Sequence, residues 1–134
     1  SPPHYTEMGP ELTRPNRGVQ VWLALHLHGV SRFRDELDRM LDLAERMAGR
    51  LGTLPGVQLI DQPQLSVVAF RAEAGDDATR AILDALLESR QVHVSSTTVD
   101  GNMYVRFAFL NQRTTDSIVD QAIEIVETKL HSRV

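Results

Sequence analysis

Arg106 is the residue of this chain whose type and position are best suited to binding an acidic group. It lies in the run Met103–Leu110, where apolar side chains recur at every second position, as is typical of a strand. A guanidinium is a permanently charged planar fork that can hold a carboxylate by two parallel hydrogen bonds. The pattern alone also allows an exposed arginine in a surface ion pair. One face of the run carries Met103, Val105, Phe107 and Phe109, and the other carries Tyr104, Arg106 and Ala108.

Lys129 is the only lysine of the chain, and it bears on whether the chain can form a Schiff base. Such chemistry requires a lysine that is buried beside its carbonyl partner. Lys129 instead falls near the end of the last predicted helix, between Glu127 and His131, where a solvated surface position is expected. This chain alone should therefore not form a Schiff base.

Two groups of polar residues suggest further sites. His26 and His28 would share a face on a strand, but on a helix they diverge by about 200°, and no third ligand lies nearby, so we expect no metal site. His93 and the polar run Ser95–Thr98 could line a substrate pocket. No Ser-His-Asp arrangement can be assigned from the sequence.

The elements that must position these residues follow from the apolar spacing and the turn signals. Residues 1–18 have a loop-like composition, and Val19–His28 fits either a strand, by its alternation, or a buried helix, since both faces are apolar. Ser31 is expected to cap a long helix that Gly52 and Pro55 stop. Strands are then predicted at Val57–Ile60, Leu65–Arg71, Val92–Thr98 and Met103–Leu110, with helices from Gly75 to Arg90 and after Thr114 or Thr115.

This order predicts one α+β fold. We expect a two-layer sandwich with about four strands in a largely antiparallel sheet, helices on one face, and two N-terminal helices before it. The length of 134 residues accommodates one domain.

Composition limits the function classes. A formal net charge of -4 argues against a nucleic-acid surface, and no apolar run reaches the roughly 18 residues of a membrane span. There is no cysteine and no signal-peptide pattern, which is compatible with the cytoplasmic location that we expect. The proline-rich start reads like a chain that begins in mid-protein.

Two segments near opposite ends of the chain carry a resemblance to a known family. The first is ELTRPNRGVQVW at Glu11–Trp22, in which the spacing of Arg14, Arg17 and the tryptophan fits the family pattern. The second is VRFAFLNQRTT at Val105–Thr115, where an arginine, a short apolar strand, an asparagine and two threonines fit. Together they resemble the C-terminal part of the group II pyridoxal-phosphate-dependent amino acid decarboxylases, the aromatic-amino-acid, tyrosine and glutamate decarboxylase group.

The resemblance implies the small C-terminal domain of a fold type I enzyme, over residues 19–134, with residues 1–18 as a linker from a large domain outside the chain. In such enzymes the small domain closes over pyridoxal phosphate held by the large domain, and the active site forms at a dimer interface. The cofactor lysine of the family has no counterpart here, so we expect no cofactor bound to this chain alone. The implied partners are the large domain, a second subunit and an amino acid substrate.

The resemblance also implies residue roles. Arg106 takes the place of an arginine that pairs with the substrate carboxylate, and Tyr5 falls where some members carry a tyrosine that reprotonates the substrate α-carbon. Arg14 and Arg17 match the motif in a role that looks more structural than catalytic. The resemblance also implies that Val19–His28 is a helix and not a strand. The turn after Thr98 departs from the family pattern, which puts a substrate contact from this turn in doubt.

Other functions remain open at this point. The chain could be the small domain of another fold type I enzyme, aminotransferase-like or a lyase, because the domain is shared more widely than the reaction. It could also be a free-standing α+β module that binds a small ligand or self-associates. The substrate amino acid is not determined by this segment.

Overall fold

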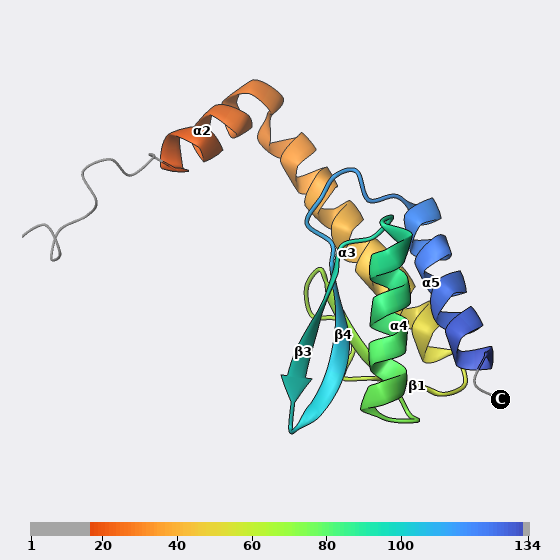
Figure 1. Ribbon diagram of the computed structural model, residues 1–134. Coiled ribbons are helices and arrows are strands. Elements are labelled where there is room, and N and C mark those ends of the chain that lie inside the picture. Colours follow the sequence, from red (N-terminus) through yellow and green to blue (C-terminus); the bar gives the residue numbers. More distant parts are fainter. Residues whose placement is uncertain (1–16, 133–134) are drawn as a thin grey trace, which may run out of the picture. The chain divides into compact units, whose positions relative to one another are not determined.

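The computed structural model describes residues 17–132, in a chain that divides into two units (Figure 1). Residues 1–35 make up the first unit, of which 17–35 are described, and residues 36–134 make up the second. The described residues form four helices and one four-stranded sheet. Their order along the chain is helix, helix, strand, strand, helix, strand, strand, helix, as the sequence predicts.

The first unit contains α2 (Arg17–His28) and the beginning of α3 (Val30–Gly52). Gly29 separates the two helices with a φ of +80°, a conformation that costs glycine little. No side chain of α2 is buried, and Trp22 is 60% exposed although its ring stacks on His26 with a centroid distance of 4.9 Å. An apolar helix of this kind is normally buried within a larger protein.

The second unit is built on an antiparallel sheet with the strand order β1-β2-β4-β3. The strands are β1 (Val57–Leu59), β2 (Val67–Ala72), β3 (Val94–Val99) and β4 (Asn102–Ala108). A tight hairpin joins β3 to β4, with positive φ at both Asp100 (50°) and Gly101 (78°). Two successive positive φ values match the right-handed twist of paired strands, which explains the Asp-Gly sequence.

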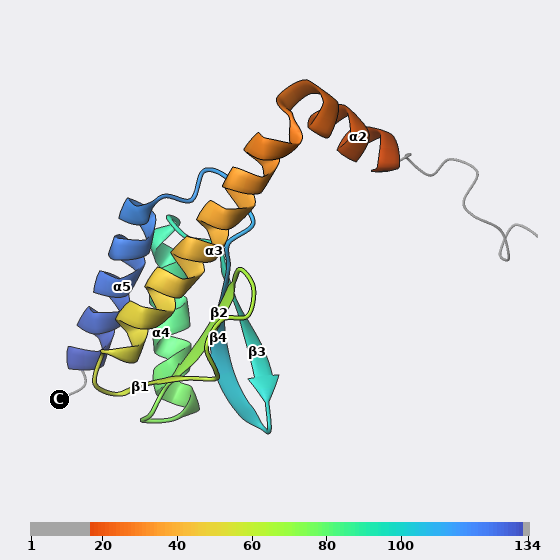
Figure 2. The ribbon, with the colours of Figure 1, turned by 180° about the vertical axis from the view of Figure 1, so that it is seen from behind.

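Helices cover one face of this sheet and enclose the core (Figures 1 and 2). They are α4 (Asp76–Ser89), α5 (Asp116–His131) and the part of α3 from Glu36 onward. The side chains of β2 and β4 that face them are buried, and the buried α3 residues recur at intervals of three and four. The central members of the core are Leu43, Met47, Leu51, Val68, Phe70, Ile82, Leu86, Val105, Phe107, Val119, Ile123 and Val126.

The predicted α+β class, the antiparallel sheet and the one-sided helix cover are confirmed. Two helix starts differ from the expectation. α2 begins at Arg17 rather than Val19, and α3 begins at Val30, so Ser31 lies inside the helix and is not its cap. The positive φ of Gly29 already separates the helices, which leaves no capping position for Ser31. Between residues 17 and 132, no helix has both the length and the apolar character to cross a membrane.

Candidate functional site

The sheet face opposite the helices brings Arg106 together with two neighbouring strands. Arg106 on β4 lies between Ala69 of β2 and Ser95 of β3, each directly opposite it in the register. Phe107 and Val105, on either side of Arg106 along β4, are buried under the helices, whereas Arg106 is exposed. The predicted orientation of Arg106, away from the core, is therefore confirmed.

Within residues 17–132, a single side-chain hydrogen bond holds the guanidinium of Arg106. Its Nε donates a hydrogen bond to Ser95 Oγ at 3.1 Å. No carboxylate among residues 17–132 forms an ion pair with Arg106. The alternative from the sequence pattern, a surface ion pair, is therefore not found in the described part of the chain, and the positive charge remains available to an external anion.

A second arginine of the same face escaped the sequence analysis. Arg71 on β2 follows Phe70, which pairs with Val105 of β4, and its guanidinium carbon is 5.7 Å from the centroid of the Tyr104 ring. The Arg71 side chain is 13% exposed and Tyr104 is 8% exposed, so each covers the other. This stacking explains why Tyr104 is buried although it is on the face opposite the core.

Arg71 is also tied to the beginning of α4. Its Nη2 lies 3.5 Å from Asp76 Oδ1, and the same oxygen accepts a hydrogen bond of 3.1 Å from the Met103 N–H. The Asp76 carboxylate therefore joins β2, β4 and the first turn of α4. Arg71 Nε is buried and has no hydrogen-bond partner within residues 17–132. The outward position of Arg71 was readable from the alternation in β2, but its pairing with Tyr104 depends on the register between distant strands.

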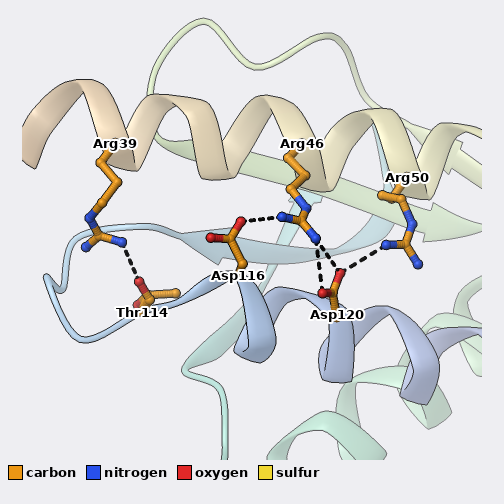
Figure 3. A network of polar contacts seen from close by, with 6 residues as sticks. All are labelled: Arg39, Arg46, Arg50, Thr114, Asp116 and Asp120. Atoms are coloured by element: carbon orange, nitrogen blue, oxygen red, sulfur yellow. Dashed lines mark hydrogen bonds and ion pairs between the residues drawn. The ribbon is translucent and has the colours of Figure 1, made fainter.

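The loop that follows β4 is held by Arg39 of α3 (Figure 3). Arg39 donates hydrogen bonds to the carbonyl oxygens of Thr114, at 2.7 Å, and Gln112, at 2.9 Å. Glu36, one turn earlier on α3, pairs with the same guanidinium at 2.5 Å and raises the pKa of Arg39 above its ordinary value. The loop is thereby fixed to α3 at both carbonyls. Nothing in the local sequence around Arg39 indicates this role.

Charged residues continue this contact along α3 and α5 (Figure 3). Asp120 accepts hydrogen bonds from Arg46, at 3.0 Å to each carboxylate oxygen, and from Arg50, at 3.0 Å. Arg46 also pairs with Asp116. These contacts fix α5, which begins directly after the loop, against α3.

The remaining predicted residues are distributed as follows. Tyr5 and Arg14 lie outside the described residues. Arg17 is the first residue of α2, and Lys129 is exposed near the end of α5, as predicted. Thr115 occupies the N-cap position of α5, but its side chain makes no capping hydrogen bond.

Only part of the polar run Ser95–Thr98 lies on the same sheet face as Arg106. The register puts Ser95 and Thr97 opposite Arg106 and Tyr104, whereas Ser96 and Thr98 lie opposite Val105 and Met103, which point to the core side. Since α2 is helical, His26 and His28 diverge, and residues 17–132 contain no cluster of three potential metal ligands.

Comparison with known proteins identifies the relatives. No protein-family profile matches the chain. An aromatic-L-amino-acid decarboxylase from Bacillus atrophaeus is 29% identical over 120 residues, which cover 84% of this chain and 25% of the relative. Tyrosine decarboxylase 2 from Arabidopsis thaliana is 23% identical over 131 residues, 92% of this chain and 24% of the relative. Further relatives include a histidine decarboxylase from Rattus norvegicus, 22% identical over 78% of this chain and 16% of the relative. The resemblance predicted from the two motifs is thus confirmed.

The fold of these decarboxylases is shared as well. The crystal structure of Catharanthus roseus tryptophan decarboxylase in complex with L-tryptophan superimposes with a TM-score of 0.80, over 90% of this chain and 26% of that one, at 18% identity. At this identity the likeness concerns the fold alone. The chain spans about a quarter of the length of the decarboxylases that it matches.

Proposed function

We propose that this chain is the small C-terminal domain of a pyridoxal-phosphate-dependent amino acid decarboxylase, in which Arg106 binds the substrate α-carboxylate. The observation that carries the proposal is the position of Arg106 within the decarboxylase-like segment Val105–Thr115, exposed on the helix-free face and without a carboxylate partner in the described chain. A solvated arginine held by a neutral hydroxyl keeps its full charge for an incoming anion.

The reaction needs more than attraction of the substrate. Pyridoxal phosphate, when bound, supplies the electron-withdrawing system that accepts the electron pair left behind by carbon dioxide. The rate of such a reaction depends on the geometry in which the reacting bond is held, so the carboxylate must be oriented as well as attracted. Two parallel hydrogen bonds from one guanidinium fix the plane of a carboxylate, and this is the task that we assign to Arg106.

The residues of this chain do not fit covalent attachment of the cofactor. Lys129, the only lysine, is exposed on α5, on the opposite side of the core from Arg106. The first turn of α4 carries Asp76 and Asp77, whose charge opposes binding of a phosphate at that helix end. We therefore assign cofactor binding to the part of the enzyme outside this chain, and to this chain the orientation of substrate and the closure of the site.

The apolar surface of α2 supports the existence of a covering partner. Val21, Trp22 and Leu27 are all more than half exposed. Exposure of this extent on one short helix is typical of an interaction surface. We propose that the large domain of the same enzyme covers it, that the segment before α2 links the two domains, and that the enzyme is a cytoplasmic homodimer.

One experiment separates the roles of the two parts. The full-length protein should bind pyridoxal phosphate and release carbon dioxide from at least one of L-tyrosine, L-tryptophan and L-glutamate. The 134-residue chain alone should do neither, because its lysine is not buried beside a carbonyl site. A stoichiometric visible absorbance band of a Schiff base in the isolated chain, lost in Lys129→Ala, would contradict the assignment. Absence of carbon dioxide release by the full-length protein would contradict the decarboxylase function.

A further inference from the structure

The hydrogen bond between Arg106 and Ser95 decides which edge of the guanidinium is free. An arginine can bind a carboxylate in parallel through Nε and one Nη, or through its two Nη atoms. In this structure Nε already donates to Ser95 Oγ at 3.1 Å. The edge formed by the two Nη atoms is therefore the one left for a bidentate carboxylate.

The strand register makes Ser95 the neighbour that selects this edge. Ser95 lies directly opposite Arg106 on β3, and Ala69 lies directly opposite it on β2. Ala69 has no polar side-chain atom, so of these two lateral neighbours only Ser95 can hold the guanidinium. Backbone pairing fixes the distance between the Cα atoms of the two strands, and the short serine side chain has few rotamers. The plane of the guanidinium is thus tied to the sheet.

We propose that Ser95 is a positioning residue that directs the two Nη atoms of Arg106 toward the substrate carboxylate. This inference rests on the proposed function of Arg106. Without the Ser95 hydroxyl the charge of Arg106 persists, so the attraction of substrate remains. The guanidinium can then rotate and bind the carboxylate through either edge. The carboxylate, and with it the bond that breaks, is therefore held in several orientations instead of one. The expected loss is therefore in kcat more than in KM.

The test uses an isosteric pair of substitutions in the full-length enzyme with pyridoxal phosphate. Ser95→Val and Ser95→Thr have the same shape, suit a strand, and differ in the hydroxyl. Carbon dioxide release is measured with L-tyrosine, L-tryptophan and L-glutamate, and the amino acid that the wild-type enzyme decarboxylates fastest is used. Ser95→Val should lower kcat about 3- to 10-fold and change KM by less than about 2-fold, as for loss of one hydrogen bond. Ser95→Thr should restore most of kcat.

Ser96→Val is the matched control. Ser96 is exposed on the same strand, and it lies opposite the buried Val105 rather than Arg106. Its replacement should leave kcat unchanged. In an Arg106→Ala background, Ser95→Val should have no further effect, because the group that it positions is gone. An additional loss in that background would overturn the inference, since Ser95 would then act by another route.

Failure of this inference is distinguishable from failure of the proposed function. If Arg106→Ala disables the enzyme while Ser95→Val retains wild-type kcat, only the role of Ser95 is wrong. If Arg106→Ala is itself fully active, the carboxylate site is wrong. A second readout needs no activity: the Nε–H resonance of Arg106 in the 134-residue chain should exchange with water faster in Ser95→Val than in Ser95→Thr. Equal exchange in the two variants would overturn the inference.

Discussion

Replacement of Asp120 by asparagine should measurably weaken the contact between α3 and α5. The carboxylate accepts hydrogen bonds from Arg46 at both oxygens and from Arg50, all at 3.0 Å. The side chains concerned are 39–48% exposed, so each pair contributes about 0.2–1 kcal/mol. The bidentate geometry toward Arg46 favours the upper part of that range. We therefore expect Asp120→Asn to lower the free energy of unfolding by about 1–2 kcal/mol.

The assay is thermal and urea unfolding of the 134-residue chain followed by circular dichroism. A loss of this size corresponds to a melting temperature lower by roughly 3–8 °C. Glu124→Gln is the matched control, because Glu124 is exposed on the same helix and no ion pair of it is found within residues 17–132. In 1 M salt, where the screening length is about 3 Å, the difference between the two variants should shrink. Equal destabilisation by both variants at low salt would refute the reasoning, as would a difference that salt leaves unchanged.

Two further predictions concern the buried hydroxyl group of Thr79 and the backbone conformation of two glycines. Thr79 is fully buried, accepts a hydrogen bond from the Ala72 N–H at 3.0 Å and donates one to Gly75 O at 2.9 Å. Thr79→Val keeps the shape and leaves that N–H unpaired, so urea unfolding should show a loss of about 1–3 kcal/mol, and Thr79→Ser should lose less. Gly101→Ala should lower the free energy of unfolding by about 1 kcal/mol, because the φ of this residue is +78°. Gly49→Ala should raise it by up to about 1 kcal/mol, because Gly49 lies in α3 with open space around the added methyl group. The opposite order of the two variants in urea unfolding would contradict this explanation.

The fold could be predicted from the sequence where local chemistry decides the structure. The Asp100-Gly101 pair specifies a tight hairpin, and the observed positive φ at both residues follows from it. The apolar spacing of α3 from Leu37 to Leu51 predicts a helix regardless of its surroundings. Val19–His28 could not be decided in this way. Its apolar residues satisfy both periods, and the helix was chosen from the decarboxylase resemblance.

The site could be predicted only in part, because its contacts join residues far apart in the sequence. The alternation in β4 predicts the exposed face of Arg106, but its bond to Ser95 depends on the register across the hairpin. The cover of Tyr104 by Arg71 requires the pairing of β2 with β4, which no local pattern specifies. Arg39 likewise contacts loop carbonyls more than seventy residues away. Such partners follow from tertiary structure alone.

The most direct test of the central claim is the catalytic efficiency of Arg106 variants of the full-length enzyme. Charge-assisted hydrogen bonds to a carboxylate contribute roughly 2–4 kcal/mol, so Arg106→Ala should lower kcat/KM about 30- to 1000-fold. Arg106→Lys should fall between wild type and alanine, because a point charge attracts the carboxylate without fixing its plane. Folding and cofactor content should survive, since Arg106 is exposed off the core face, and Arg113→Ala, an exposed arginine of the following loop, should be near wild type. Near wild-type kcat/KM in Arg106→Ala would contradict the proposed carboxylate site.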